Sequence, residues 1–159
     1  MNLDFGSAEP GGRRAADVFN DLTGGRVNRK VSLLRACYWF GAVFDAVMVV
    51  PMLVPSVAAS MFRIKAFDPG VEYRYAMMIG GSLMLGWTAL LIWADRKPVE
   101  RREVLLLSVC PVVVGLAAAG VYAVAAGLIT PRNMAPTWVM QAVLLVTFTY
   151  AYAASRPAP

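Results

Sequence analysis

The chain has 159 residues, 58% of them hydrophobic, and a formal net charge of +5 at pH 7. This apolar share is larger than one soluble domain of that length needs for its core, which indicates a membrane protein. The basic residues cluster beside apolar stretches, where they orient a membrane protein and meet anionic lipid, so we expect no nucleic-acid partner.

The chain contains two cysteines, Cys37 and Cys110, and no histidine. Histidine is the usual axial ligand of haem and the commonest zinc ligand, and two isolated thiols cannot form a four-ligand zinc site. We therefore expect no metal and no cofactor, and we expect both cysteines to be buried structural thiols.

Residues 1–30 are polar and rich in glycine and charge, and they predict a cytoplasmic N-terminal tail. Apolar residues at helical spacing between Arg13 and Leu22 indicate a short amphipathic helix on the membrane surface, with a tail of no fixed structure as the alternative. The first long apolar stretch comes too late for a cleavable signal peptide.

Four long apolar stretches follow this tail. They predict membrane-spanning helices at about residues 33–54, 75–94, 104–129 and 137–154. Each is close to the roughly 20 residues that a helix needs to cross a bilayer core of about 30 Å. Backbone amides in lipid must form hydrogen bonds within their own segment, so we predict an all-α polytopic membrane domain. We expect it to be a four-helix antiparallel bundle over residues 31–155, followed by a C-terminal stub at 156–159.

The connections between the spans have different characters. Pro51 and Pro55 are expected to bend or end the first span, and Ser56–Glu72 is expected to be an external loop with one interfacial turn around Met61 and Phe62. The charged connection at residues 95–103 is short, so the second and third spans should form a hairpin.

Basic residues set the expected orientation. Eleven lysines and arginines lie in the N-terminal region up to Arg35, the charged connection and the C-terminus, against four in the remaining connections. The excess predicts that both termini are cytoplasmic. The alanine-, valine- and arginine-rich composition favours a bacterial source, and thus the inner membrane.

Small residues indicate where helices pack closely, because lipid tails do not drive helices together by apolarity. The second span offers Gly80, Gly81, Ser82 and Gly86, and the third span offers Gly115, Ala119, Ala123 and Gly127 at intervals of four. We expect both faces to be contact surfaces, either within one chain or in a homo-oligomer or larger membrane complex.

Asp45 is the one charged residue deep within a span. It lies twelve residues after Leu33, or roughly 18 Å along a helix, near the middle of the bilayer. A carboxylate there costs about 2.5–3.5 kcal/mol on insertion scales. Counting depth along the other spans places Ser82 and Gln141 at the same level, so the three are expected to form one polar site. Asp45 is either a proton- or cation-binding carboxylate or a buried polar lock between helices.

Arg74 is a candidate contact for an anionic headgroup at the outer start of the second span, between Tyr73 and Tyr75. The alternative is an interfacial anchor whose side chain reaches toward the headgroups.

Three short segments resemble a known group of proteins: Tyr73 to Met77, Gly86 to Thr88, and Trp93 to Pro98. They are similar to segments of small bacterial inner-membrane proteins that have four helices and no assigned activity. The resemblance covers residues 31–128 and implies a fold but no chemistry. The lone carboxylate of the first span is also loosely similar to that of small multidrug transporters, which are shorter and use glutamate there.

Three functions remain open on the sequence alone. The first is a non-enzymatic membrane subunit or oligomer-forming module, which explains the small-residue faces and the lack of reactive groups. The second is a small proton- or cation-coupled transporter using Asp45. The third is an enzyme acting on lipid or quinone, for which only Glu72 and Arg74 lie near one interface.

Overall fold

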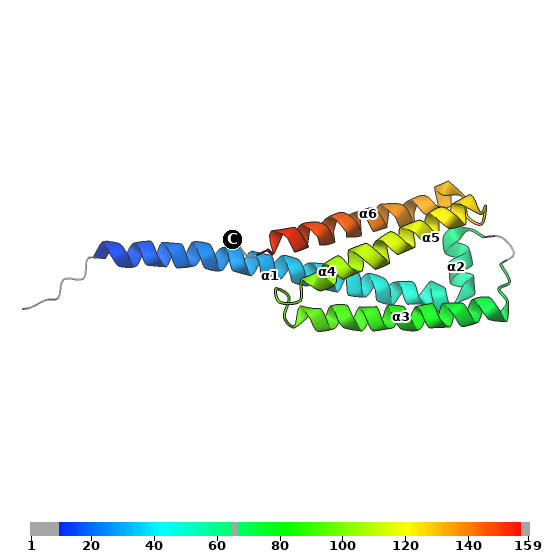
Figure 1. Cartoon of the computed structure of the whole chain (residues 1–159), viewed down its shortest axis with the longest axis horizontal. Helices are drawn as coiled ribbons and strands as arrows, with labels where there is room; N and C mark the ends of the chain where they lie inside the picture. The colour runs from blue at the N-terminus through cyan, green and yellow to red at the C-terminus, as the bar shows by residue number, and fades with distance from the viewer. Residues whose placement is uncertain (1–9, 65–66, 157–159) are drawn as a thin grey trace, which may run out of the picture.

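The computed structural model describes residues 10–64 and 67–156, with side-chain positions from residue 28 onward. Its elements are α1 (Pro10–Leu53), α2 (Pro55–Phe62), α3 (Val71–Asp95), α4 (Glu103–Leu107), the π-helix η1 (Ser108–Val113), α5 (Val114–Ala125) and α6 (Pro131–Ala154). Figure 1 shows their arrangement. Over these ranges the chain is helical without strands, which confirms the all-α fold.

Four helical stretches are long and apolar enough to cross a membrane, as predicted. They cover Asn28–Leu53, Val71–Asp95, Glu103–Ala125 and Pro131–Ala154. The shortest has 23 residues, about 34 Å of helix at about 1.5 Å per residue. The last begins six residues before the predicted start, because Pro131 opens the helix after an extended Thr130 (φ −73°, ψ 147°).

Helix α1 is much longer than the first predicted span. It runs 44 residues without a break, through most of the segment expected to be a polar tail. Figure 1 shows its first half continuing past the rest of the bundle as a single rod. The pairs Gly11-Gly12 and Gly24-Gly25 do not interrupt it, so the structure contains neither a separate surface helix nor a free tail between Pro10 and Lys30.

The first span ends where proline predicts. Pro51 lies in the last turn of α1, and the extended backbone of Val54 (φ −117°) leads directly to Pro55 at the start of α2. Helix α2 replaces the first part of the predicted loop, including its interfacial turn, and Arg63 ends the helix in a left-handed conformation (φ 54°). Residues 67–70 are not helical, as predicted. Asn133 Nδ2 donates to the Phe62 carbonyl oxygen at 3.2 Å, which ties the end of α2 to the start of α6.

Helix α3 packs along α1, and two of its predicted small residues make this possible. A Cβ atom at Gly81 would lie 3.3 Å from Leu53 Cδ2, and one at Gly80 would lie 2.6 Å from Met52 Cε. Ser82 is exposed, and a Cβ atom at Gly86 would meet nothing within 4 Å. The predicted contact face therefore holds for Gly80 and Gly81 but not for Ser82 and Gly86.

The third span is interrupted by the π-helix η1, which we did not predict. Pro111 lies within it. Proline has no N–H to donate and its ring crowds the preceding turn, and a wider π turn accommodates both effects. The interruption separates α4 from α5, and the predicted helix to residue 129 ends at Ala125 instead.

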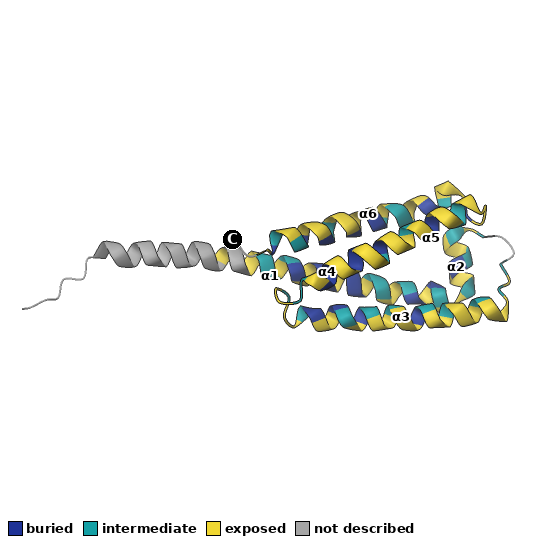
Figure 2. Cartoon of the chain, viewed as in Figure 1, coloured by how far each residue is buried: buried dark blue, intermediate teal, exposed yellow. Residues whose placement is uncertain are grey.

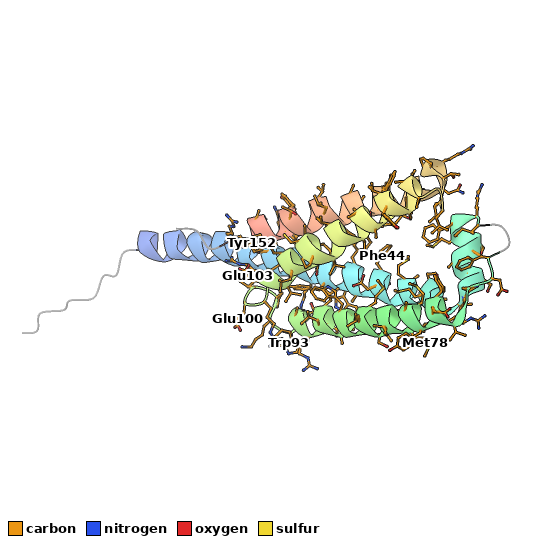
Figure 3. The ribbon with its side chains drawn as sticks, turned by 45° about the vertical axis from the view of Figure 1, so that its right-hand side comes forward. Phe44, Met78, Trp93, Glu100, Glu103 and Tyr152 are labelled. Atoms are coloured by element: carbon orange, nitrogen blue, oxygen red, sulfur yellow. The ribbon has the colours of Figure 1, made fainter. Side chains whose placement is uncertain are left out.

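The bundle has two ends with different packing. We call the end with Asp95 and Ser155 the Asp95 end, and the opposite end the α2 end. Most members of the buried core lie toward the Asp95 end, including Leu34, Tyr38, Leu91, Leu105 and Phe148. In Figures 1 and 3, the α1–α3 and α5–α6 pairs lie closest there and are further apart at the α2 end, where α2 lies across them. Figure 2 shows the buried residues along the facing sides of these helices.

Candidate functional site

Asp45 lies on the inward stripe of α1. Ala42 and Val49, one turn to either side of it, are both buried, and Asp45 itself is half-buried. Within the described part of the chain, its carboxylate forms no hydrogen bond and no ion pair. A carboxylate in this position is costly in lipid, so its lack of a protein partner argues against a closed polar lock.

Ser82 and Gln141, the predicted partners of Asp45, form no hydrogen bond with it. The Ser82 hydroxyl donates to the Met78 carbonyl oxygen of its own helix at 2.9 Å and is exposed. Gln141 is 9% exposed, and its Oε1 atom has no partner among the described residues. The three residues share a depth by sequence, but depth alone does not determine which way a side chain points around its helix.

Gln141 instead lies in a groove between α5 and α6. The groove has a volume of about 430 Å³ and an almost entirely apolar lining that includes Val113, Val121 and Trp138. Like Gln141 Oε1, Trp138 Nε1 is buried without a described partner. Each unpaired buried polar atom lowers the stability of the closed α5–α6 contact.

The predicted headgroup site at the start of α3 is exposed. Arg74 Nε donates to the Pro69 carbonyl oxygen at 3.4 Å, a long hydrogen bond. Tyr73 packs edge-on against Phe67, with ring centroids 5.2 Å apart, while Tyr75 is 67% exposed. Arg74 and Tyr75 are thus free to meet lipid, whereas Tyr73 is engaged within the chain.

The small-residue face of the third span is uncovered within the chain. Gly115 and Ala119 are exposed, and a Cβ atom at Gly115 would meet nothing within 4 Å. Ala123 is partly buried, and Gly127 lies beyond α5 in a turn with φ +72°. A different glycine, Gly120, faces α6: its Cβ atom would lie 3.0 Å from Trp138 Nε1.

The Asp95 end carries a polar network that sequence reasoning did not identify. Arg35 Nε lies 3.3 Å from Asp95 Oδ1, an ion pair without hydrogen-bond geometry, and Trp39 Nε1 donates to Asp95 Oδ2 at 3.3 Å. The Tyr38 hydroxyl lies 2.9 Å from the Arg101 carbonyl oxygen. The available signal was the position of Asp95 as the first charge after an apolar span, level with Arg35 on the antiparallel helix.

The two cysteines differ in exposure. Cys37 is buried as predicted, but Cys110, which lies within η1, is exposed. Among the described residues, no group of three or more cysteine, aspartate or glutamate side chains is placed to hold a metal ion.

These sites can take part in two kinds of event. The uncovered α5 face can accept another helix at close range, because small residues let backbones approach. The carboxylate of Asp45 can accept a proton or a cation. Comparison of the chain with protein-family models, curated proteins and solved structures finds no match.

Proposed function

We propose that the protein is a non-enzymatic integral membrane subunit that assembles with a second copy of itself through the face of α5 carrying Gly115 and Ala119. The membrane class rests on the four apolar helices. The assembly role rests on one observation, that this face is uncovered in the single chain.

The contrast between neighbouring glycines on α5 supports the proposal. Gly120 already serves the contact with α6, where Trp138 and Met134 lie within 3.4 Å of its added Cβ atom. Packing within the chain therefore does not require the small side chains at Gly115 and Ala119. Small residues spaced four apart on a lipid-facing surface allow a second helix to approach closely, which is how many membrane helices associate.

The proposal also includes a location and an orientation. We place the protein in a bacterial inner membrane with both termini in the cytoplasm, the Asp95 end inward and the α2 end outward. The excess of lysine and arginine toward the Asp95 end supports this orientation, with eleven residues against four.

Disulfide cross-linking in native membranes tests the assembly. A chain carrying Cys37→Ala, Cys110→Ser and Ala119→Cys has a single thiol on the proposed interface. Oxidation with copper phenanthroline is expected to give a covalent dimer on a non-reducing gel.

The matched control is Leu83→Cys in the same background, because Leu83 is 70% exposed on the distant helix α3. It is expected to remain monomeric under the same conditions. Equal cross-linking of the two variants, or none for Ala119→Cys, would contradict assembly of identical chains through α5.

A second candidate function is proton- or cation-coupled transport, favoured by the unpartnered carboxylate of Asp45. Proteoliposomes loaded with the pH dye pyranine and given an inward proton gradient test it directly. Transport through Asp45 predicts acidification by the unaltered chain that is lost in Asp45→Asn and kept in the exposed control Glu72→Gln. Acidification that persists in a folded Asp45→Asn chain would rule this function out.

A further inference from the structure

Three basic side chains from separate parts of the chain converge on the last turn of α6. Lys30 Nζ, from α1, donates to the Arg156 carbonyl oxygen at 3.2 Å. Arg102 Nη1, from the residue before α4, donates to the Ser155 carbonyl oxygen at 3.1 Å. The guanidinium carbons of Arg102 and Arg156 lie 5.7 Å and 5.2 Å from the ring centroid of Tyr152. We call Lys30, Arg102, Arg156 and Tyr152 the Tyr152 cluster.

The positive charge of this cluster is only partly compensated. Its hydrogen bonds at the helix end go to backbone carbonyl oxygens, which position the cations without neutralising them. Among the described residues, Glu103 is the one carboxylate paired with any of the three, with Oε1 3.4 Å from Arg102 Nε. Counted over the described residues, three cations face one carboxylate, an excess of two positive charges.

The cluster lies at the boundary of the apolar spans. In sequence, Lys30 comes just before the apolar stretch that begins at about Leu33, and Arg156 comes just after α6, which ends at Ala154, so both lie where apolar spans end. Figure 3 shows Tyr152 and Glu103 at this same end of the bundle. Phospholipid headgroups occupy this depth, and tyrosine is enriched there.

We propose that the Tyr152 cluster binds the phosphate of an anionic phospholipid. Guanidinium groups match phosphate oxygens in geometry and charge, and the lysine adds a third donor. Basic sites between helices at the membrane surface recognise anionic headgroups in this way. One lipid would touch α1, the start of α4 and the end of α6, and would therefore hold three spans together.

Native mass spectrometry of the full chain in detergent tests the site. The chain is incubated with dioleoyl phosphatidylglycerol or with dioleoyl phosphatidylcholine. We expect retention of one phosphatidylglycerol and much less phosphatidylcholine. Each basic residue is expected to contribute about fivefold to phosphatidylglycerol binding. Arg102→Gln combined with Arg156→Gln should therefore weaken that binding by about 25-fold. The control pair Arg63→Gln and Arg132→Gln, both exposed at the other end, should bind as the unaltered chain does.

Three results would overturn the proposal. The first is equal retention of phosphatidylglycerol and phosphatidylcholine. The second is a loss of phosphatidylglycerol binding in the control pair equal to that in the double variant. The third is a rise in the thermal unfolding midpoint with inorganic phosphate alone that matches the rise with phosphatidylglycerol. If the double variant does not fold, Lys30→Gln provides the comparison, because it leaves both arginine contacts with Tyr152 in place. It is expected to lose about fivefold in phosphatidylglycerol binding, and unchanged binding would refute the site.

Discussion

The Tyr38 hydroxyl links the first span to the connection between the second and third. It lies 2.9 Å from the Arg101 carbonyl oxygen and 3.3 Å from that of Pro98, while the ring is fully buried. Arg101 is held further by Trp93, whose ring centroid lies 3.4 Å from the guanidinium carbon. The side chains of Tyr38, Arg101 and Trp93 thus hold the connection between the second and third spans against the Asp95 end of the bundle.

Removing this hydroxyl should measurably destabilise the chain. Tyr38→Phe is expected to lower the free energy of unfolding in detergent by about 1 kcal/mol, because the ring stays but the hydrogen bond is lost. Denaturant unfolding followed by circular dichroism measures the change. Tyr75→Phe, on a 67% exposed side chain, should leave the midpoint unchanged. Equal midpoints for the two variants would show that the hydroxyl does not stabilise this end.

Gly41 lies where α1, α3 and α6 meet. A Cβ atom there would lie 2.8 Å from Phe148 Cζ and 3.1 Å from Leu91 Cδ1. Gly41→Ala is therefore expected to cost about 1–3 kcal/mol of unfolding free energy through overpacking, measured by the same unfolding experiment.

Gly86→Ala is the matched substitution for Gly41→Ala, because its Cβ atom would meet nothing within 4 Å. It should be neutral or slightly stabilising, since alanine favours helix over glycine. A chain that tolerated both substitutions equally would contradict the described contact of α1 with α3 and α6.

At the scale of elements, η1 and α3 are joined by a partly buried hydrogen bond. Trp87 Nε1 donates to Ser108 Oγ at 3.1 Å, and Ser108 Oγ donates to the Val104 carbonyl oxygen at 2.9 Å. Ser108 is 3% exposed, so its hydroxyl lies within the bundle. This bond links the third span to the second at the π-helix.

A double-mutant cycle tests the contact between these elements. Ser108→Ala leaves the Trp87 N–H without its acceptor and should cost about 1–2 kcal/mol of unfolding free energy. Trp87→Phe combined with Ser108→Ala should cost less than the sum of the two single changes, because both remove the same bond. Additive costs would mean that the two side chains act independently.

The elements also show what the sequence can and cannot predict. Apolar length predicted the four spans, because lipid leaves an apolar segment of about 20 residues few alternatives to helix. The course of α1 back to Pro10 was missed, since glycine pairs and polar composition usually end helices. The π-helix was missed because Pro111 within a span predicts a distortion but not its type.

The candidate sites were harder to predict than the spans. A four-residue interval identifies a face of a helix but not which neighbour it meets, so Gly120 rather than Gly115 proved to contact α6. Counting residues from the membrane edge gives depth but not direction, which is why Ser82 forms no hydrogen bond with Asp45. Both quantities depend on how each helix is rotated in the bundle, and packing between helices decides that rotation.

At the scale of the whole molecule, the two ends of the bundle differ. The Asp95 end is closed by the buried core and by contacts such as Arg35 with Asp95. At the α2 end, Asn133 links α2 to α6 through a single side-chain hydrogen bond.

We therefore expect the Asp95 end to open last. Hydrogen exchange of the full chain in detergent should show slower exchange for amides near Leu91 and Leu105 than for those of α2. Faster exchange near Leu91 would contradict this order.

Cysteine labelling in intact bacterial cells tests the central claim, four spans with the Asp95 end inward. In a chain with Cys37→Ala and Cys110→Ser, single cysteines are introduced at the exposed positions Asp68 and Glu100. A membrane-impermeant maleimide is predicted to label Asp68→Cys in intact cells, and Glu100→Cys only after the inner membrane is permeabilised. Labelling of both from the same side, or with the sides exchanged, would contradict the account.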